Sequence, residues 1–267
     1  MIRFLLLLFI VTSFASGEKV AVLTFDDSIK SHYTVVRPIL KKLDFNATFF
    51  ITEGWDFKTN KTAYMTWDEI KQLHLDGFEI GNHTRDHMGV TQKSIPRLKE
   101  QLEYIAQQCE KVGIPKPISF AYPGNRYHID AFDIFKDLGF KFARRGNYPK
   151  LPKLNNIGFM FEPGVDHPYL IPCSGIAIPS WDLKDFKDAL IQQNPTQIPI
   201  LQFHGVPDEP HPWVNTSKEN FIKFMDHLKK ENYKVIALKD LSTYLKNKTT
   251  PPNPLKIKET RKQSIQP

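Results

Sequence analysis

A chain of 267 residues, 41% of them hydrophobic, can bury one full core, and α/β barrels of this size commonly form a single domain. The formal net charge of +7 is held in good part by the end of the chain. No aromatic residues are interleaved with the basic ones there, which argues against a nucleic-acid-binding protein. Export would permit a disulfide between the two cysteines, Cys109 and Cys173, without favouring one, and Cys109 is expected to be a buried thiol.

The first 17 residues have the order of a secretory signal peptide. Arg3 precedes an apolar run at 4–11, and small residues follow at 15–17. This run is shorter than the roughly 20 residues that a membrane helix needs, and no second run of sufficient length follows. We therefore expect an exported protein, periplasmic or extracellular, with no membrane span.

From residue 18 onwards, short apolar runs that predict strands alternate with apolar residues at helical spacing. An irregular stretch at 147–172 and a short apolar run near Ile176 interrupt the alternation. In chain order, we expect strands at 19–25, 48–51, 78–80, 118–122, 140–143, 198–203 and 235–238, and helices at 31–43, 66–75, 94–112, 131–138, 183–191 and 217–228.

Seven or eight strand-then-helix units predict an α/β fold with parallel strands joined by right-handed crossovers. We expect a distorted (β/α)7-8 barrel over residues 18–246, with a doubly wound open sheet as the alternative. Residues 247–267 are basic and rich in proline and polar side chains, so a disordered tail is expected there.

Two histidines, His83 and His87, follow the third expected strand. If the chain forms a helix after Gly81, both imidazoles project from one face and can share a cation. A carboxylate from elsewhere would complete a set of two nitrogens and one oxygen with an open position, the arrangement of a catalytic zinc site. Without that carboxylate, the pair would be surface histidines on a turn.

Asp26 and Asp27 end the first expected strand. Adjacent buried carboxylates repel each other unless a cation or hydrogen bonds compensate. A metal ion would do so if one aspartate were a ligand and its neighbour a general base. In isolation, the same dipeptide would be a solvated helix N-cap.

His204 ends a later apolar strand, and Gly205 allows the backbone to approach a ligand closely. A histidine at this place can donate a proton to a leaving group, but a lone histidine at a strand end is more often structural. Its role therefore depends on the other site residues.

These segments resemble the polysaccharide deacetylases of the NodB-homology type over roughly residues 19–245. The ordered motifs are Thr-Phe-Asp-Asp at 24–27, His-Thr-x-x-His at 83–87, an aromatic-Pro-Gly turn at 120–124 and Phe-His-Gly at 203–205. The resemblance implies a distorted (β/α) barrel that hydrolyses N-acetyl, sometimes O-acetyl, groups on a sugar polymer such as chitin, chitooligosaccharide or peptidoglycan. It also implies a divalent metal cofactor, zinc first, with cobalt or another divalent ion as alternatives.

Carried over residue by residue, the resemblance makes Asp26 the catalytic base and His204 the general acid. It makes Asp27, His83 and His87 the metal ligands. The turn at Tyr122, Pro123 and Gly124 corresponds to the segment that holds the oxyanion through a backbone N–H, with Gly124 as the expected donor.

Two features depart from the family pattern. Ala121 stands where many members have an arginine beside the base, and we hypothesise that Arg144 or Arg145 supplies the missing cation. The aspartate that pairs with the general acid is also displaced; Asp182, Asp166 and Asp208 are the candidates. Aromatic residues near the mouth could stack on sugar rings or pack in the core: Trp55, Trp67, Trp181 and Trp213.

Two alternative functions remain open. The altered arginine motif would fit a catalytically impaired carbohydrate-binding pseudoenzyme. The same site would also fit a metal-dependent hydrolase of another non-peptide C–N bond. The sequence predicts no oligomeric state.

Overall fold

The apolar first strand lies at the centre of a parallel sheet. The structure is a computed structural model and describes residues 18–265; the expected signal peptide lies outside them. Strand β1 (Val20–Phe25) pairs with β7 (Ile200–Phe203) on one side, and with β8 (Lys234–Ile236) and then β2 (Thr48–Ile51) on the other. All residues of β1 are buried, as expected for a strand covered on both faces.

The sheet runs in the order β5-β4-β3-β2-β1-β7-β6, with β8 attached to β1. Its other strands are β3 (Glu79–Asn82), β4 (Ser119–Ala121), β5 (Phe142–Arg144) and β6 (Gly175–Ile176). Ile171 forms a parallel bridge with Arg144 at one edge, and the Ser174 N–H donates to the Ile200 carbonyl near the other. Parallel strands curled into a half-barrel confirm the expected barrel and exclude the doubly wound sheet.

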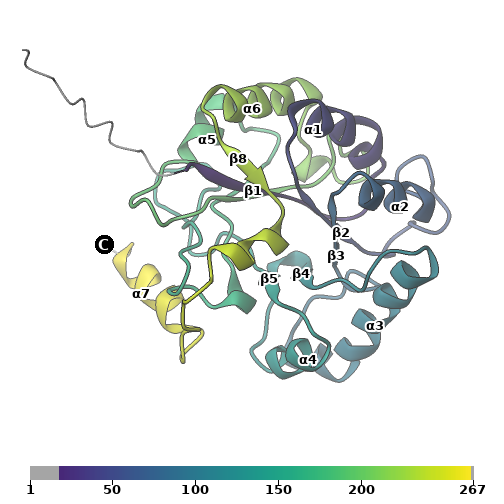
Figure 1. Ribbon diagram of the computed structural model, residues 1–267, viewed down its shortest axis with the longest axis horizontal. Coiled ribbons are helices and arrows are strands. Elements are labelled where there is room, and N and C mark those ends of the chain that lie inside the picture. The colour runs from purple at the N-terminus through teal and green to yellow at the C-terminus, as the bar shows by residue number, and fades with distance from the viewer. Residues whose placement is uncertain (1–17, 266–267) are drawn as a thin grey trace, which may run out of the picture.

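Helices surround the curled sheet (Figure 1). They are α1 (Arg37–Leu43), α2 (Trp67–Leu75), α3 (Ile95–Lys111), α4 (Ala131–Asp137), α5 (Leu183–Asp188) and α6 (Lys218–Lys230). Hydroxyl caps begin two of them: Thr66 Oγ1 accepts the Glu69 N–H before α2, and Ser217 Oγ accepts the Asn220 N–H before α6. Both cysteines are free and buried, which confirms the buried thiol expected at Cys109.

Alternation along the strands separates two apolar layers. Val20 and Val22 pack with Phe142 and Ile200 inside the barrel, whereas the alternate β1 residues Leu23 and Phe25 pack outward in the helix-covered core. Asp26 continues the inward series of Val20, Val22 and Thr24. The alternation therefore directs a polar residue at the C-terminal end of β1 into the barrel mouth.

The C-terminal tail was predicted to be disordered, but the structure shows an ordered segment there. It forms α7 (Lys256–Ser264), and the Arg261 guanidinium donates to both carboxylate oxygens of buried Asp166, at 2.7 and 3.1 Å. Composition predicted disorder wrongly, because it does not reveal the two contacts that hold the segment. One is the buried, bidentate ion pair, and the other is the packing of Leu255 against the apolar cluster around α3 and α4.

Arg261→Ala is expected to lower the thermal midpoint by several degrees, because breaking a buried ion pair costs about 3 kcal/mol. Lys262→Ala is the matched control, because Lys262 is next to Arg261 in the sequence but its side chain is exposed. Calorimetry of both variants measures the effect. Equal midpoints for the two would show that α7 does not stabilise the fold.

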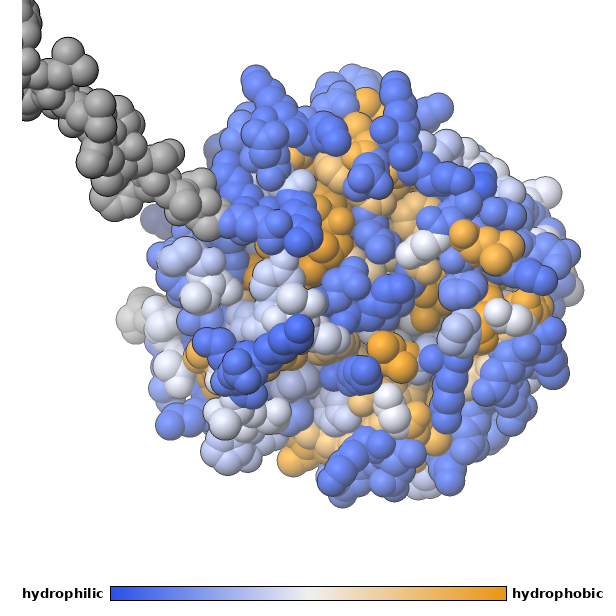
Figure 2. Space-filling view, in the orientation of Figure 1, coloured by the Kyte–Doolittle hydropathy of each residue, from blue (hydrophilic) through white to orange (hydrophobic). Residues whose placement is uncertain are grey.

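Within residues 18–265, no helix combines the length and apolar character needed to cross a membrane. On the face in view in Figure 2, hydrophilic side chains cover most of the surface, and hydrophobic residues lie between them in separate patches.

Candidate metal centre and active site

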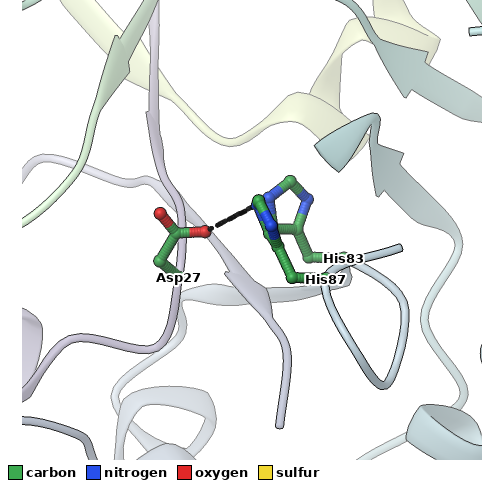
Figure 3. Close-up of side chains that lie close together, drawn as sticks. All are labelled: Asp27, His83 and His87. Carbon is green, nitrogen blue, oxygen red and sulfur yellow. Dashed lines mark ion pairs between the residues drawn. The ribbon is translucent and has the colours of Figure 1, made fainter. Parts of the chain in front are cut away.

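Asp27, His83 and His87 lie together at the C-terminal end of the sheet (Figure 3). Asp27 Oδ1 is 3.3 Å from His83 Nε2 and 3.4 Å from His87 Nε2. One ligand atom of each residue lies within 4.8 Å of the others, which is close enough for all three to bind one ion.

The loops after β1 and β3 set this geometry. Asp27 follows β1 with φ of +75°, an uncommon conformation for a residue other than glycine. Residues 83–87 form a turn rather than the expected helix, with φ of +60° at Thr84 and +52° at His87. This turn brings the two imidazole rings to a centroid distance of 4.9 Å, so the histidines share a site without helical spacing.

The donor set fits a divalent cation. His83 Nδ1 lies 2.8 Å from the Ala121 carbonyl, which can only accept a hydrogen bond, so Nδ1 carries the proton and Nε2 keeps its lone pair for a metal. Asp27 Oδ1 is buried and has no hydrogen-bond partner among residues 18–265. Burial first, and then the charge of His83, lower the pKa of His87 to about 4, which keeps it neutral. Two neutral nitrogens and one carboxylate oxygen suit zinc or a similar ion.

Asp26 lies beside this cluster in a different environment. Arg144 Nη2 donates to both of its carboxylate oxygens, at 2.6 and 2.5 Å, and Gln202 Nε2 donates to Oδ2 at 2.9 Å. The Arg144 side chain is wholly buried. Two donors therefore fix the carboxylate inside the barrel mouth.

The cation beside Asp26 comes from β5, the strand next to β4, on which the family pattern has its arginine. Arg144 on β5 is the register partner of Ala121 on β4, so both positions face the barrel interior. Arg145 points away from Asp26; its guanidinium donates to backbone carbonyls that include Leu170 O at 3.1 Å. Of the two hypothesised arginines, the structure brings only Arg144 to the base position.

His204 also faces the cluster, with Nε2 3.7 Å from Asp27 Oδ2. Its Nδ1 is buried without a hydrogen-bond partner among the described residues. Two proposed carboxylate partners are occupied elsewhere: Asp166 pairs with Arg261, and Asp182 caps α5 by accepting the Lys184 and Asp185 N–H groups. Their predicted role beside His204 is therefore wrong.

A cavity of about 410 Å³ opens over these residues and is lined by Asp26, Asp27, His83, His87 and His204 among others. Gly124, with φ of +58°, also lines it. Tyr122 cannot offer a backbone donor there, because its N–H donates to the Arg144 carbonyl, and Pro123 has no N–H. Gly124 is thus the residue of the predicted turn that remains for this role.

Two tryptophans line the cavity: Trp55 is 49% exposed and Trp213 is 67% exposed. Trp67 instead donates its indole N–H to Glu53, and Trp181 is buried in the core. His211 and Gln202 also line the cavity, although neither was predicted as a site residue from the sequence. Gln202 had a usable signal, because it is a polar residue within an otherwise apolar strand.

Comparisons with known proteins point to one family. The sequence profile of the family described as polysaccharide deacetylase matches residues 15–143. The chain is 29% identical over 127 residues to a peptidoglycan-N-acetylglucosamine deacetylase of Bacillus cereus, covering 47% of this chain and 56% of that protein. It is 31% identical over 96 residues to a peptidoglycan-N-acetylmuramic acid deacetylase of Bacillus subtilis, covering 36% and 34%. The alignments span about half or less of these relatives.

Solved structures share the fold. A family 4 acetyl xylan esterase from Clostridium thermocellum in complex with a cobalt ion superposes with a TM-score of 0.58 at 21% identity, covering 90% of this chain and 96% of that one. A CE4 family pseudoenzyme from Bacillus anthracis gives 0.56 at 19% identity, covering 85% and 66%. The chain thus matches the polysaccharide deacetylase family over residues 15–143, and it shares the fold of these solved structures.

Proposed function

We propose that this protein is an exported, metal-dependent deacetylase that hydrolyses N-acetyl groups of a glycan to free amine and acetate. One observation carries the proposal. Asp27, His83 and His87 converge on one point, while Asp26, held by Arg144, lies beside them in the same cavity. Export rests on the signal-like sequence of residues 1–17.

Each residue has a separate chemical task. A divalent ion held by Asp27, His83 and His87, with zinc as the first candidate and cobalt as an alternative, would supply Lewis acidity that activates water at neutral pH. Asp26 accepts the proton of the attacking water at its carboxylate. Gly124 lines the cavity, and its backbone N–H is the expected donor to the oxygen of the former carbonyl, a type of interaction commonly worth about 3 kcal/mol. The departing amine needs a proton from a cavity imidazole.

Peptidoglycan is the first substrate to examine, because relatives described as peptidoglycan deacetylases match the chain. Chitin and chitooligosaccharides are the alternatives. A catalytically impaired carbohydrate-binding protein is a second candidate, favoured by Ala121 at the family arginine position. A hydrolase of another non-peptide C–N bond is a third.

Acetate release decides between these functions. The purified protein is loaded with zinc or cobalt, supplied with each glycan, and compared with the metal-stripped protein. Release from one glycan that is abolished by metal removal supports the proposal. Glycan binding without release from any acetylated substrate identifies a pseudoenzyme, and turnover restricted to small amides identifies the other hydrolase.

Trp213→Ala is expected to raise KM about fivefold with kcat nearly unchanged. The indole borders the cavity and can cover a sugar ring. It would then contribute about 1 kcal/mol of binding free energy to the ground state and the transition state alike. Ile191→Ala serves as the control, because it removes a similarly exposed apolar side chain outside the cavity lining. Steady-state kinetics on the best glycan measures both; an unchanged KM for Trp213→Ala would place the sugar elsewhere.

A further inference from the structure

Two buried side chains from the segment between β1 and α1 hold the loop after β7, which begins at His204. His32 Nε2 lies 3.1 Å from the His204 carbonyl oxygen. One residue earlier, Ser31 Oγ accepts the Val206 N–H at 2.7 Å and donates to the Pro207 carbonyl at 2.8 Å. The segment that follows the proposed base therefore also binds the backbone that follows His204.

The peptide group between His204 and Gly205 is held on both sides. His32 bonds its carbonyl oxygen, and Asp208 Oδ2 accepts its N–H at 2.8 Å. Asp208, the third carboxylate considered from the sequence as a partner of His204, thus bonds the backbone beside it. A Cβ at Gly205 would meet Asp208 Cα at 2.6 Å, so the glycine is needed for this close approach. The two hydrogen bonds fix the plane of the peptide next to the His204 side chain.

His32 is wholly buried and does not line the catalytic cavity. A carbonyl oxygen only accepts hydrogen bonds, so the proton of the neutral ring is on Nε2. The ring centroid lies 5.5 Å from those of Phe25 and Phe49, and burial lowers the pKa of His32 to about 4. A neutral imidazole in one tautomer is therefore directed at the His204 carbonyl.

The ring of His204 depends on this backbone for its place. Within residues 18–265, its Nδ1 is buried without a hydrogen-bond partner, and its Nε2 lies 3.7 Å from Asp27 Oδ2, beyond hydrogen-bond distance. Proton transfer requires the donor and the acceptor at hydrogen-bond distance. A small displacement of this ring would therefore slow a proton transfer while the metal ligands stay in place.

We propose that His32 is a positioning residue, whose Nε2–H fixes the peptide after His204 so that His204 can protonate the departing amine. This role rests on the proposed deacetylation, in which the family resemblance implies that His204 is the acid. The carbon–nitrogen bond breaks, its electron pair remains on nitrogen, and nitrogen takes the proton from His204. His32 keeps its own proton throughout, so it acts only through the residue that it holds.

Two substrates with different leaving groups separate this role from a purely structural one. A glycan acetamide expels an amine that must be protonated, whereas para-nitrophenyl acetate expels a phenolate that needs no acid. His32→Phe keeps an aromatic ring in the core but removes the donor. It is expected to lower kcat at least about tenfold on the acetamide and less than about threefold on the aryl ester. Metal content should equal that of the wild-type protein.

His32→Gln tests rescue, because its side-chain amide can donate to the same carbonyl. It is expected to keep kcat on the acetamide within about threefold of the wild-type value. Phe49→Leu is the matched control, since it changes a ring beside His32 but leaves the donor, and it should lower stability without changing the ratio of the two rates. Equal losses on both substrates for His32→Phe, or the same acetamide loss in His32→Gln, would overturn the proposal.

NMR of the wild-type protein gives a readout that needs neither a variant nor glycan turnover. The long-range nitrogen–proton spectrum of the His32 ring should show a neutral imidazole protonated at Nε2 at neutral pH. A neutral ring protonated at Nδ1 contradicts the bond to the His204 carbonyl. If the wild-type protein releases no acetate from any glycan, the proposed function fails and this role fails with it. Glycan turnover together with either contrary result for the His32 variants overturns the role of His32 alone.

Discussion

Asp26→Asn is expected to abolish deacetylation while metal binding persists, whereas Asp27→Asn is expected to lose both. Adjacent residues thus have separable tasks, because Asp26 is bonded by Arg144 and Asp27 is directed at two imidazole nitrogens. Loss of a general base commonly lowers the rate by about 100- to 10,000-fold. Loss of the carboxylate ligand removes the negative charge from the cation site.

The measurement pairs metal content with acetate release for each variant. Thermal unfolding is recorded alongside, since Asn at position 26 leaves the buried Arg144 cation without its full charge partner. His83→Gln is the matched control, because it should behave like Asp27→Asn. Retained metal in Asp27→Asn, or retained turnover in Asp26→Asn, would contradict the assignment of ligand and base.

The strands and the main cluster could be predicted because both depend on local pattern. An apolar run predicts a strand, and the C-terminal ends of parallel strands form the mouth of the barrel. Polar residues at these ends therefore lie close together. Asp27, His83 and His87 follow this rule. The conformation of the loop after His83 could not be predicted in this way. The positive φ values at Thr84 and His87 are set by contacts with Thr52 and Met88 rather than by sequence periodicity.

Partners across the barrel were harder to predict. Alternation selects Arg144 over Arg145 as the inward residue, yet only the register of β4 against β5 shows that it reaches the position facing Asp26. Asp166 and Asp182 failed as candidates because each bonds a local or terminal partner that no periodicity reveals. The contact of Asp208 Oδ1 with His211 Nδ1, at 3.1 Å, lies within one loop, where hydrogen bonds to the backbone determine the conformation.

Arg144→Met is expected to lower kcat at least about 100-fold, because Asp26 loses the guanidinium that donates to both of its carboxylate oxygens and fixes it in the barrel mouth. Breaking such a buried pair also costs roughly 3 to 5 kcal/mol of stability. Arg145→Met is the matched control: this side chain is also buried but bonds backbone carbonyls. It should lose stability while keeping more of its kcat.

Adding Ala121→Arg to the Arg144→Met variant should recover part of the lost activity. Positions 121 and 144 are register partners facing the same interior, so a guanidinium from either strand can reach Asp26. Methionine at position 144 is shorter than arginine and leaves space for the arginine at position 121. Kinetics and thermal unfolding of the single and double variants measure the recovery. If the double variant folds and binds metal but gains no activity, then Arg144 acts through something other than the positive charge that it holds beside the base.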